Sequence, residues 1–167
     1  MALKNLCSVF IVLLFSFSLF FSKAIAEPTF VQSKLIDDKF YLGLNFNNDG
    51  TKMYTVNAGA GTSDAVIEYI LTTPYDISTA IVNNTFGVSR GGHTQATQVV
   101  FNNDGTKMFI VNHAGNKSVD EYLLSTAFDV STATFDSEIS ISGQEQRANS
   151  IAFNNDGTRM VVAGVGN

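Results

Sequence analysis

An eight-residue segment, Phe-Asn-Asn-Asp-Gly-Thr-Lys-Met, occurs at residues 46–53 and again without change at residues 101–108. It occurs a third time at residues 153–160, where Arg159 replaces the lysine. The spacings are 55 and 52 residues, and such an identity does not arise by chance. Self-similarity at a nearly fixed period is the signature of a repeat architecture, in which each copy forms one supersecondary unit. The chain is therefore predicted to consist largely of tandem units.

A second motif accompanies the first. Residues 68–71 (Glu-Tyr-Ile-Leu) correspond to residues 121–124 (Glu-Tyr-Leu-Leu), and residues 75–80 correspond to residues 128–133, in each case 53 positions later. The repeats lie within the predicted mature chain, residues 27–167, and we refer to them as the first, second and third units. Their approximate bounds are residues 41–95, 96–147 and 148–167, and residues 29–36 are a candidate outer strand of a preceding unit.

Each full unit is predicted to contain four antiparallel strands. The Asn-Asn-Asp-Gly segment forms a hairpin turn between the first two strands, because glycine adopts the left-handed conformation and Asp and Asn bond back to the backbone. Residues 108–111 (Met-Phe-Ile-Val) are apolar without a break, so the second strand is predicted to be buried on both faces. The residues to which we assign this structural turn are Asp49, Gly50, Asp104, Gly105, Asp156 and Gly157.

The order of an aromatic residue, two polar residues, Asp-Gly-Thr-Lys and an apolar strand resembles the repeat of the YVTN and lactonase-type β-propellers. It is also similar to the WD-repeat-like units of bacterial periplasmic propellers. The resemblance covers nearly all of residues 41–167 and implies an all-β fold of four-stranded antiparallel blades. Propellers close with about four to eight blades, whereas roughly two and a half are present here. A fragment of a longer product, or completion by assembly with other chains, is therefore expected.

Residues 1–26 are predicted to be a signal peptide. Lys4 precedes an apolar run at residues 9–21, and Ala24-Ile25-Ala26 supplies small residues for cleavage. An uncleaved membrane anchor is the alternative, because the uncharged stretch that ends before Lys23 has 18 residues, near the lower limit for spanning. Cys7 is the only cysteine, so the mature chain forms no disulfide. This pattern favours a bacterial exported protein, periplasmic or extracellular.

The net charge is −5, and it becomes −7 once the signal peptide is removed, because that segment holds two lysines and no acid. An acidic chain without basic clusters repels phosphate backbones, so a nucleic acid is not expected as a partner. Self-association or the further blades of a longer chain are the expected contacts, because end faces of an apolar stack remain exposed.

The loops that differ between units share one end of the predicted stack, and binding groups usually lie on such variable loops. No catalytic, metal-binding or cofactor-binding residue is predicted, because the two histidines lack the converging carboxylates that a metal or a general base requires. A calcium loop is also excluded, since Val56 occupies the position where its closing glutamate belongs. The candidate ligand-binding residues are Arg90, His93, Gln95, His113, Glu145 and Arg147.

These observations favour an exported binding or scaffold module of the propeller type without a catalytic site. The alternative is a fragment of a larger propeller enzyme, a lactonase-type hydrolase or a quinoprotein, whose active site lies in other blades. The repeated motif specifies a turn, so it does not decide between the two functions.

Overall fold

The computed structural model describes residues 30–31, 33–36, 41–58, 64–91 and 94–166. The predicted signal peptide and His93 lie outside the described residues. Residues Gln32–Asn167 form one compact body. Among the described residues, no helix is long and apolar enough to cross a membrane.

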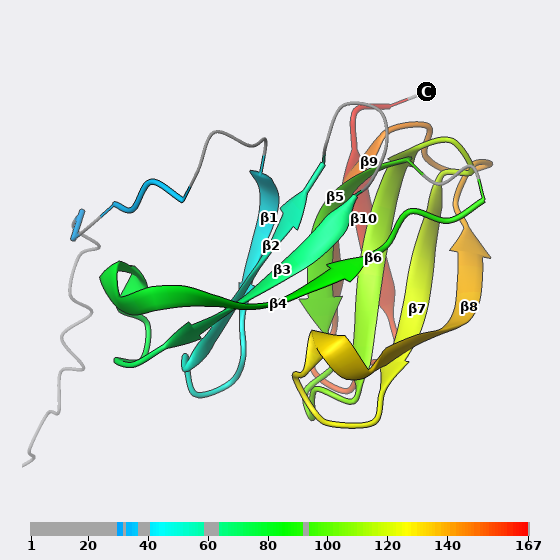
Figure 1. The fold of residues 1–167 in the computed structure, drawn as a ribbon. Coiled ribbons are helices and arrows are strands. Elements are labelled where there is room, and N and C mark those ends of the chain that lie inside the picture. The colour runs from blue at the N-terminus through cyan, green and yellow to red at the C-terminus, as the bar shows by residue number, and fades with distance from the viewer. Residues whose placement is uncertain (1–29, 32, 37–40, 59–63, 92–93, 167) are drawn as a thin grey trace, which may run out of the picture. The chain divides into compact units, whose positions relative to one another are not determined.

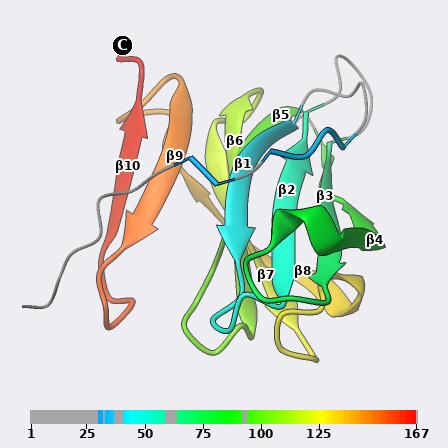
Figure 2. The same cartoon turned by 90° about the vertical axis from the view of Figure 1, so that its left-hand side faces the viewer.

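The compact body contains two four-stranded antiparallel sheets and a two-stranded hairpin (Figure 1). The first sheet consists, in order, of β1 (Tyr41–Phe46), β2 (Lys52–Asn57), β3 (Ala65–Leu71) and β4 (Ala80–Gly87). The second consists of β5 (Thr94–Phe101), β6 (Lys107–Ala114), β7 (Ser118–Leu124) and β8 (Ala133–Ser140). The hairpin consists of β9 (Ala148–Phe153) and β10 (Met160–Gly164) (Figure 2), and β9 contacts both β5 and β6. The predicted fold class, all-β with open four-stranded sheets, is confirmed.

The Asn-Asn-Asp-Gly turns have the predicted conformation. In the second unit, Asp104 Oδ1 accepts hydrogen bonds from the Thr106 backbone N–H at 3.0 Å and from the Thr106 hydroxyl at 2.6 Å. The hydroxyl contact in particular lowers the pKa of Asp104 from its ordinary value. Gly105 has a φ of +72°, and its counterparts Gly50 and Gly157 have values of +72° and +70°. A left-handed residue at this place is therefore common to all three units.

An aromatic ring covers two of these three glycines. A Cβ atom added at Gly105 would lie 2.2 Å from the Phe128 ring, and one added at Gly50 would lie 2.3 Å from the Tyr75 ring. At Gly157, by contrast, nothing lies within 4 Å of the corresponding position. The glycine is thus required at the first two turns for backbone conformation and for space.

Short 3₁₀-helices follow the third strands, and the sequence analysis did not predict them. They are η1 (Ile77–Thr79) and η2 (Val130–Thr132). In each, an aspartate forms the N-cap: Asp76 accepts the Ser78 N–H and Asp129 accepts the Ser131 N–H, both at 3.0 Å. The Asp-x-Ser sequence satisfies the amides of a single helical turn, which is too short to produce helical periodicity.

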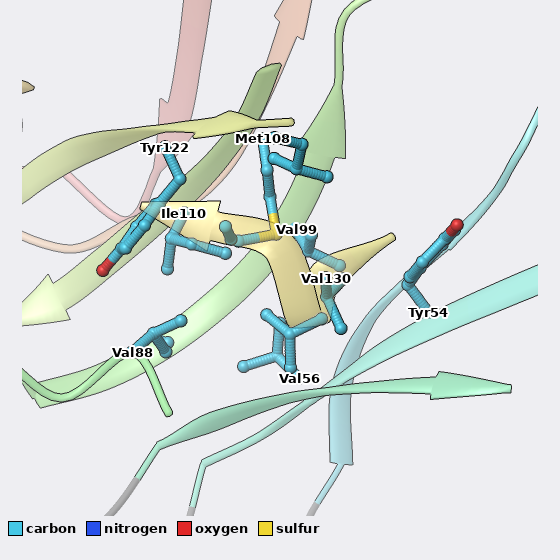
Figure 3. Close-up of a cluster of buried hydrophobic side chains, with 12 residues drawn as sticks. Tyr54, Val56, Val88, Val99, Met108, Ile110, Tyr122 and Val130 are labelled. Atoms are coloured by element: carbon cyan, nitrogen blue, oxygen red, sulfur yellow. The ribbon is translucent and has the colours of Figure 1, made fainter. Parts of the chain in front are cut away.

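The core lies between the sheets, as the unbroken apolar run of the second strand predicts. From β6, Met108 and Ile110 belong to a cluster that contains Tyr54 and Val56 of the first sheet (Figure 3). Phe109 and Val111, which alternate with them along β6, belong to another cluster with Ile151 of the hairpin. Residues of both faces of β6 are therefore buried, each by a neighbouring unit.

The expected outer strand at residues 29–36 is absent from the described part of that segment, since residues 30–31 and 33–36 form no strand. Lys34 instead reaches the turn between β3 and β4. Its Nζ atom donates to the carbonyl oxygens of Ser78 at 3.2 Å and Ala80 at 2.5 Å. A side-chain contact replaces the backbone ladder that a strand would form.

We predict that Gly105→Ala lowers the melting temperature more than Gly157→Ala. Both changes place an L-residue at positive φ, at a cost of about 1–2 kcal/mol. Only Gly105→Ala also forces Phe128 out of position. Thermal unfolding followed by circular dichroism measures the difference, and equal losses would show that the ring contact contributes nothing.

Candidate functional site

Two of the candidate ligand-binding residues that sequence analysis selected from the variable loops, Gln95 and His113, lie on adjacent strands. His113 belongs to β6 rather than to a loop, because this strand continues to Ala114. The pairing of Thr94 with Ala114, and of Ala96 with Asn112, places Gln95 at the level of His113 on the neighbouring strand. Gln95 itself is exposed and has a φ of +58°.

The His113 side chain connects the second unit to the third. Its Nδ1 atom lies 3.3 Å from the Ala148 carbonyl oxygen and 3.1 Å from Asn149 Oδ1, both at the start of β9. The imidazole is half-buried there. Its contacts are a backbone carbonyl and an amide, which orient the ring and position β9 beside β6.

Glu145 and Arg147 lie together in the connection between β8 and β9. Glu145 Oε1 accepts a hydrogen bond from the Arg147 backbone N–H at 2.9 Å. The Arg147 carbonyl oxygen in turn accepts from Val165 N–H at 3.2 Å, beyond the end of β10. These polar groups therefore shape the loop, and they lie directly before the residues that His113 contacts.

Arg90 does not join this group. Its guanidinium carbon lies 3.2 Å from the centroid of the Phe135 ring on β8, so a cation–π contact holds the side chain against the second sheet. Its Nη1 atom is buried without a hydrogen-bond partner. The structure thus places Gln95 and His113 on adjacent strands, Glu145 and Arg147 in the connection before β9, and Arg90 against Phe135, and it does not describe His93.

No group of three or more His, Cys, Asp or Glu side chains is arranged to hold a metal ion within the part of the chain that the structure describes. The described candidate residues offer hydrogen-bonding groups of mixed charge.

A fully buried carboxylate lies elsewhere, at the junction of the first two units. The Glu68 side chain on β3 has no exposed surface. Its Oε1 atom lies 2.9 Å from Lys52 Nζ and accepts from Asn83 Nδ2 at 2.6 Å. Its Oε2 atom accepts the backbone N–H of Val130 at 2.9 Å, across the boundary with the second unit.

Lys52 and Tyr54 complete this junction from β2. Both donate to the carbonyl oxygen of Phe128, the lysine Nζ at 2.8 Å and the tyrosine hydroxyl at 2.7 Å. Burial and the nearby Glu68 carboxylate raise the pKa of Tyr54, so the hydroxyl remains a donor. Three side chains of one unit therefore hold the backbone of the next unit's turn at residues 128–130.

Asp64 forms a second buried link between these units. It is 4% exposed and precedes β3, and its Oδ2 atom accepts the Ala96 N–H of β5 at 2.7 Å. Sequence analysis did not select Asp64 or Glu68. The sequence contained a signal for Glu68, because a glutamate recurs inside the apolar third strand of both units, in Glu-Tyr-Ile-Leu and in Glu-Tyr-Leu-Leu. Asp64 had none, since Lys117 occupies the matching position in the second unit.

No protein-family model and no curated protein matches this sequence. Solved structures do resemble the fold. A protein of Bacteroides fragilis, provisionally assigned as a 6-phosphogluconolactonase, superposes with a TM-score of 0.60 at 16% identity over 79% of this chain. One from Bacteroides uniformis with the same provisional assignment gives 0.58 at 10% identity over 75% of this chain. The chain spans 34% of the length of each. The similarity shows the fold alone, that of partial propeller blades.

We predict that Glu68→Gln destabilises the protein more than the same change at its counterpart Glu121. Loss of the charge at Glu68 leaves Lys52 and the Val130 amide poorly matched in a buried site, at a cost of about 3 kcal/mol. Glu121 pairs with Lys107, whose side chain is 44% exposed, so its change costs less than about 1 kcal/mol. Chemical denaturation of both variants measures the costs, and similar values would contradict the role of Glu68 as the junction residue.

Proposed function

We propose that this chain is an exported binding or scaffold module built from YVTN-like propeller repeats. The observation that carries the proposal is the use of the buried carboxylates. Glu68 and Asp64 accept backbone N–H groups of the adjoining unit, so the polar interior joins the units. The loop end, which holds Gln95, His113, Glu145 and Arg147, is the surface on which the module would bind a ligand.

A role in a larger propeller enzyme is the second candidate. It is favoured by the similarity to the two Bacteroides proteins, both provisionally assigned as lactonases. In this case the described blades would form part of the scaffold and the reacting groups would be completed by other blades. An assay with the lactone tests whether this chain alone supplies the reacting groups.

We predict that the purified chain does not accelerate the hydrolysis of 6-phosphogluconolactone above the spontaneous rate. His113 is held by an amide and a carbonyl and lacks a carboxylate to orient it as a base. The assay follows lactone loss in the presence of the chain and of its His113→Ala and Glu145→Gln variants. Turnover that either substitution abolishes, with folding intact by circular dichroism, would support the enzyme instead.

Export is tested separately from binding. We predict that mass spectrometry of the protein recovered from outside the cytoplasm finds Glu27 as its first residue, because cleavage follows Ala24-Ile25-Ala26. Membrane-bound material that retains residues 1–26 would show that the segment is an uncleaved anchor.

A further inference from the structure

The outer face of the first sheet, which is the face turned away from the second unit, is buried. Along β2, Tyr54 and Val56 belong to the cluster shared with the second sheet, whereas Met53 belongs to a separate cluster with Ile67 and Tyr69. The exposed fractions of Met53, Ile67 and Tyr69 are 4%, 5% and 2%. Sequence analysis expected such an end face to remain exposed, so the structure must supply a cover for it.

Residues 33–36, which we call the N-terminal strap, form part of this cover. Ile36 packs against the outer-face cluster, together with Tyr41, Phe46 and Ile77 of the first unit. The four residues of the strap form no strand, so they do not extend the sheet through backbone pairing. Side-chain contacts therefore attach the strap to the first unit.

Lys34 provides the polar contact of the strap. Its ammonium group donates to the carbonyl oxygens of Ser78 and Ala80, at the end of η1. The first junction uses the same chemistry, because Lys52 of the first unit donates to the Phe128 carbonyl oxygen, which lies just before η2 in the second unit. In both places a lysine from the preceding element holds the turn between the third and fourth strands.

The segment around the strap has a different composition from a unit. Residues 32–39, Gln-Ser-Lys-Leu-Ile-Asp-Asp-Lys, contain four charged residues and lack the Asn-Asn-Asp-Gly motif. The end of a stack of repeats requires a polar outer surface for solubility, and a charged segment suits this place better than an apolar strand.

We propose that the N-terminal strap is a built-in cap, which occupies the outer face of the first sheet in place of a preceding unit. Ile36 covers apolar side chains there, and Lys34 holds the turn of the first unit as Lys52 holds that of the second. A partner has to displace the strap before it can pack on this face. The cap is independent of any ligand at the loop end and of any activity on lactones.

A single introduced cysteine reports the cover, because Cys7 is the only cysteine of the chain and lies outside the predicted mature part. Ala80→Cys places a thiol in the outer-face cluster, where Ala80 is 6% exposed. The rate at which a thiol reagent modifies it in the mature chain follows the fraction of molecules that are locally open. Lys34→Ala removes two charge-assisted hydrogen bonds and is expected to raise this rate about tenfold or more.

Two matched variants separate the strap from the stability of the whole chain. Leu35→Ala changes the neighbouring side chain, which is 85% exposed, and is expected to leave the rate unchanged. Ala133→Cys places the thiol at the counterpart of Ala80 in the second unit, within the cluster shared with the first sheet. Lys34→Ala is expected to leave the modification of this second thiol unchanged, because the strap does not cover it.

Three results would overturn the proposal. Equal rates at Ala80→Cys with and without Lys34→Ala would show that the strap does not protect the face. Equal acceleration at Ala80→Cys and at Ala133→Cys would show that Lys34 stabilises the whole chain rather than a local cap. A rate at Ala80→Cys that falls as the concentration of the chain with Lys34 intact rises would identify a second copy of the chain as the cover.

Discussion

The contact on which the stack depends is the burial of the Glu68 carboxylate against the backbone of the next unit. A carboxylate without exposed surface is stable only when charged and hydrogen-bonding partners surround it. Lys52 supplies the charge from the same sheet, but Val130 N–H comes from the second unit. Separation of the two units would leave this carboxylate without one of its partners and would expose Val56 and Ile110, which are both buried. The first sheet therefore keeps its buried carboxylate hydrogen-bonded and its apolar face covered only when the second sheet packs against it.

The same sequence occupies different environments according to its place in the stack. Lys52 and Glu68 hold a turn, whereas Lys107 and Glu121 face a pocket, although the residues are chemically alike. The turn glycines also differ in environment from unit to unit, because aromatic rings cover Gly50 and Gly105 but not Gly157. Environment, rather than residue type, thus separates a buried junction from an accessible one.

The strands and hairpin turns could be predicted because they depend on local chemistry that recurs, namely apolar runs and Asp-Gly. The contacts between sheets could not, because they join residues far apart in the sequence. Arg90 was selected from its loop alone, and its contact with the Phe135 ring, 45 residues further along the chain, has no signal in the sequence. Residues 29–36 were a candidate outer strand of a preceding unit, and residues 30–31 and 33–36 form no strand. Lys34 contacts carbonyl oxygens there through its side chain instead.

The repeated motif has a second use that explains why its end of the units is so uniform. Within each turn, Asp and Gly set the backbone, and these residues would suffice for a hairpin. The second Asn of the motif acts between units, since Asn48 bonds to the Asn103 carbonyl and Asn103 to the Asn155 carbonyl. A change at this Asn would therefore disturb two units at once. At the other end the described contacts between units use different residues at each junction, Asp64 with Ala96 and His113 with Ala148 and Asn149, so the residues of this end are able to differ.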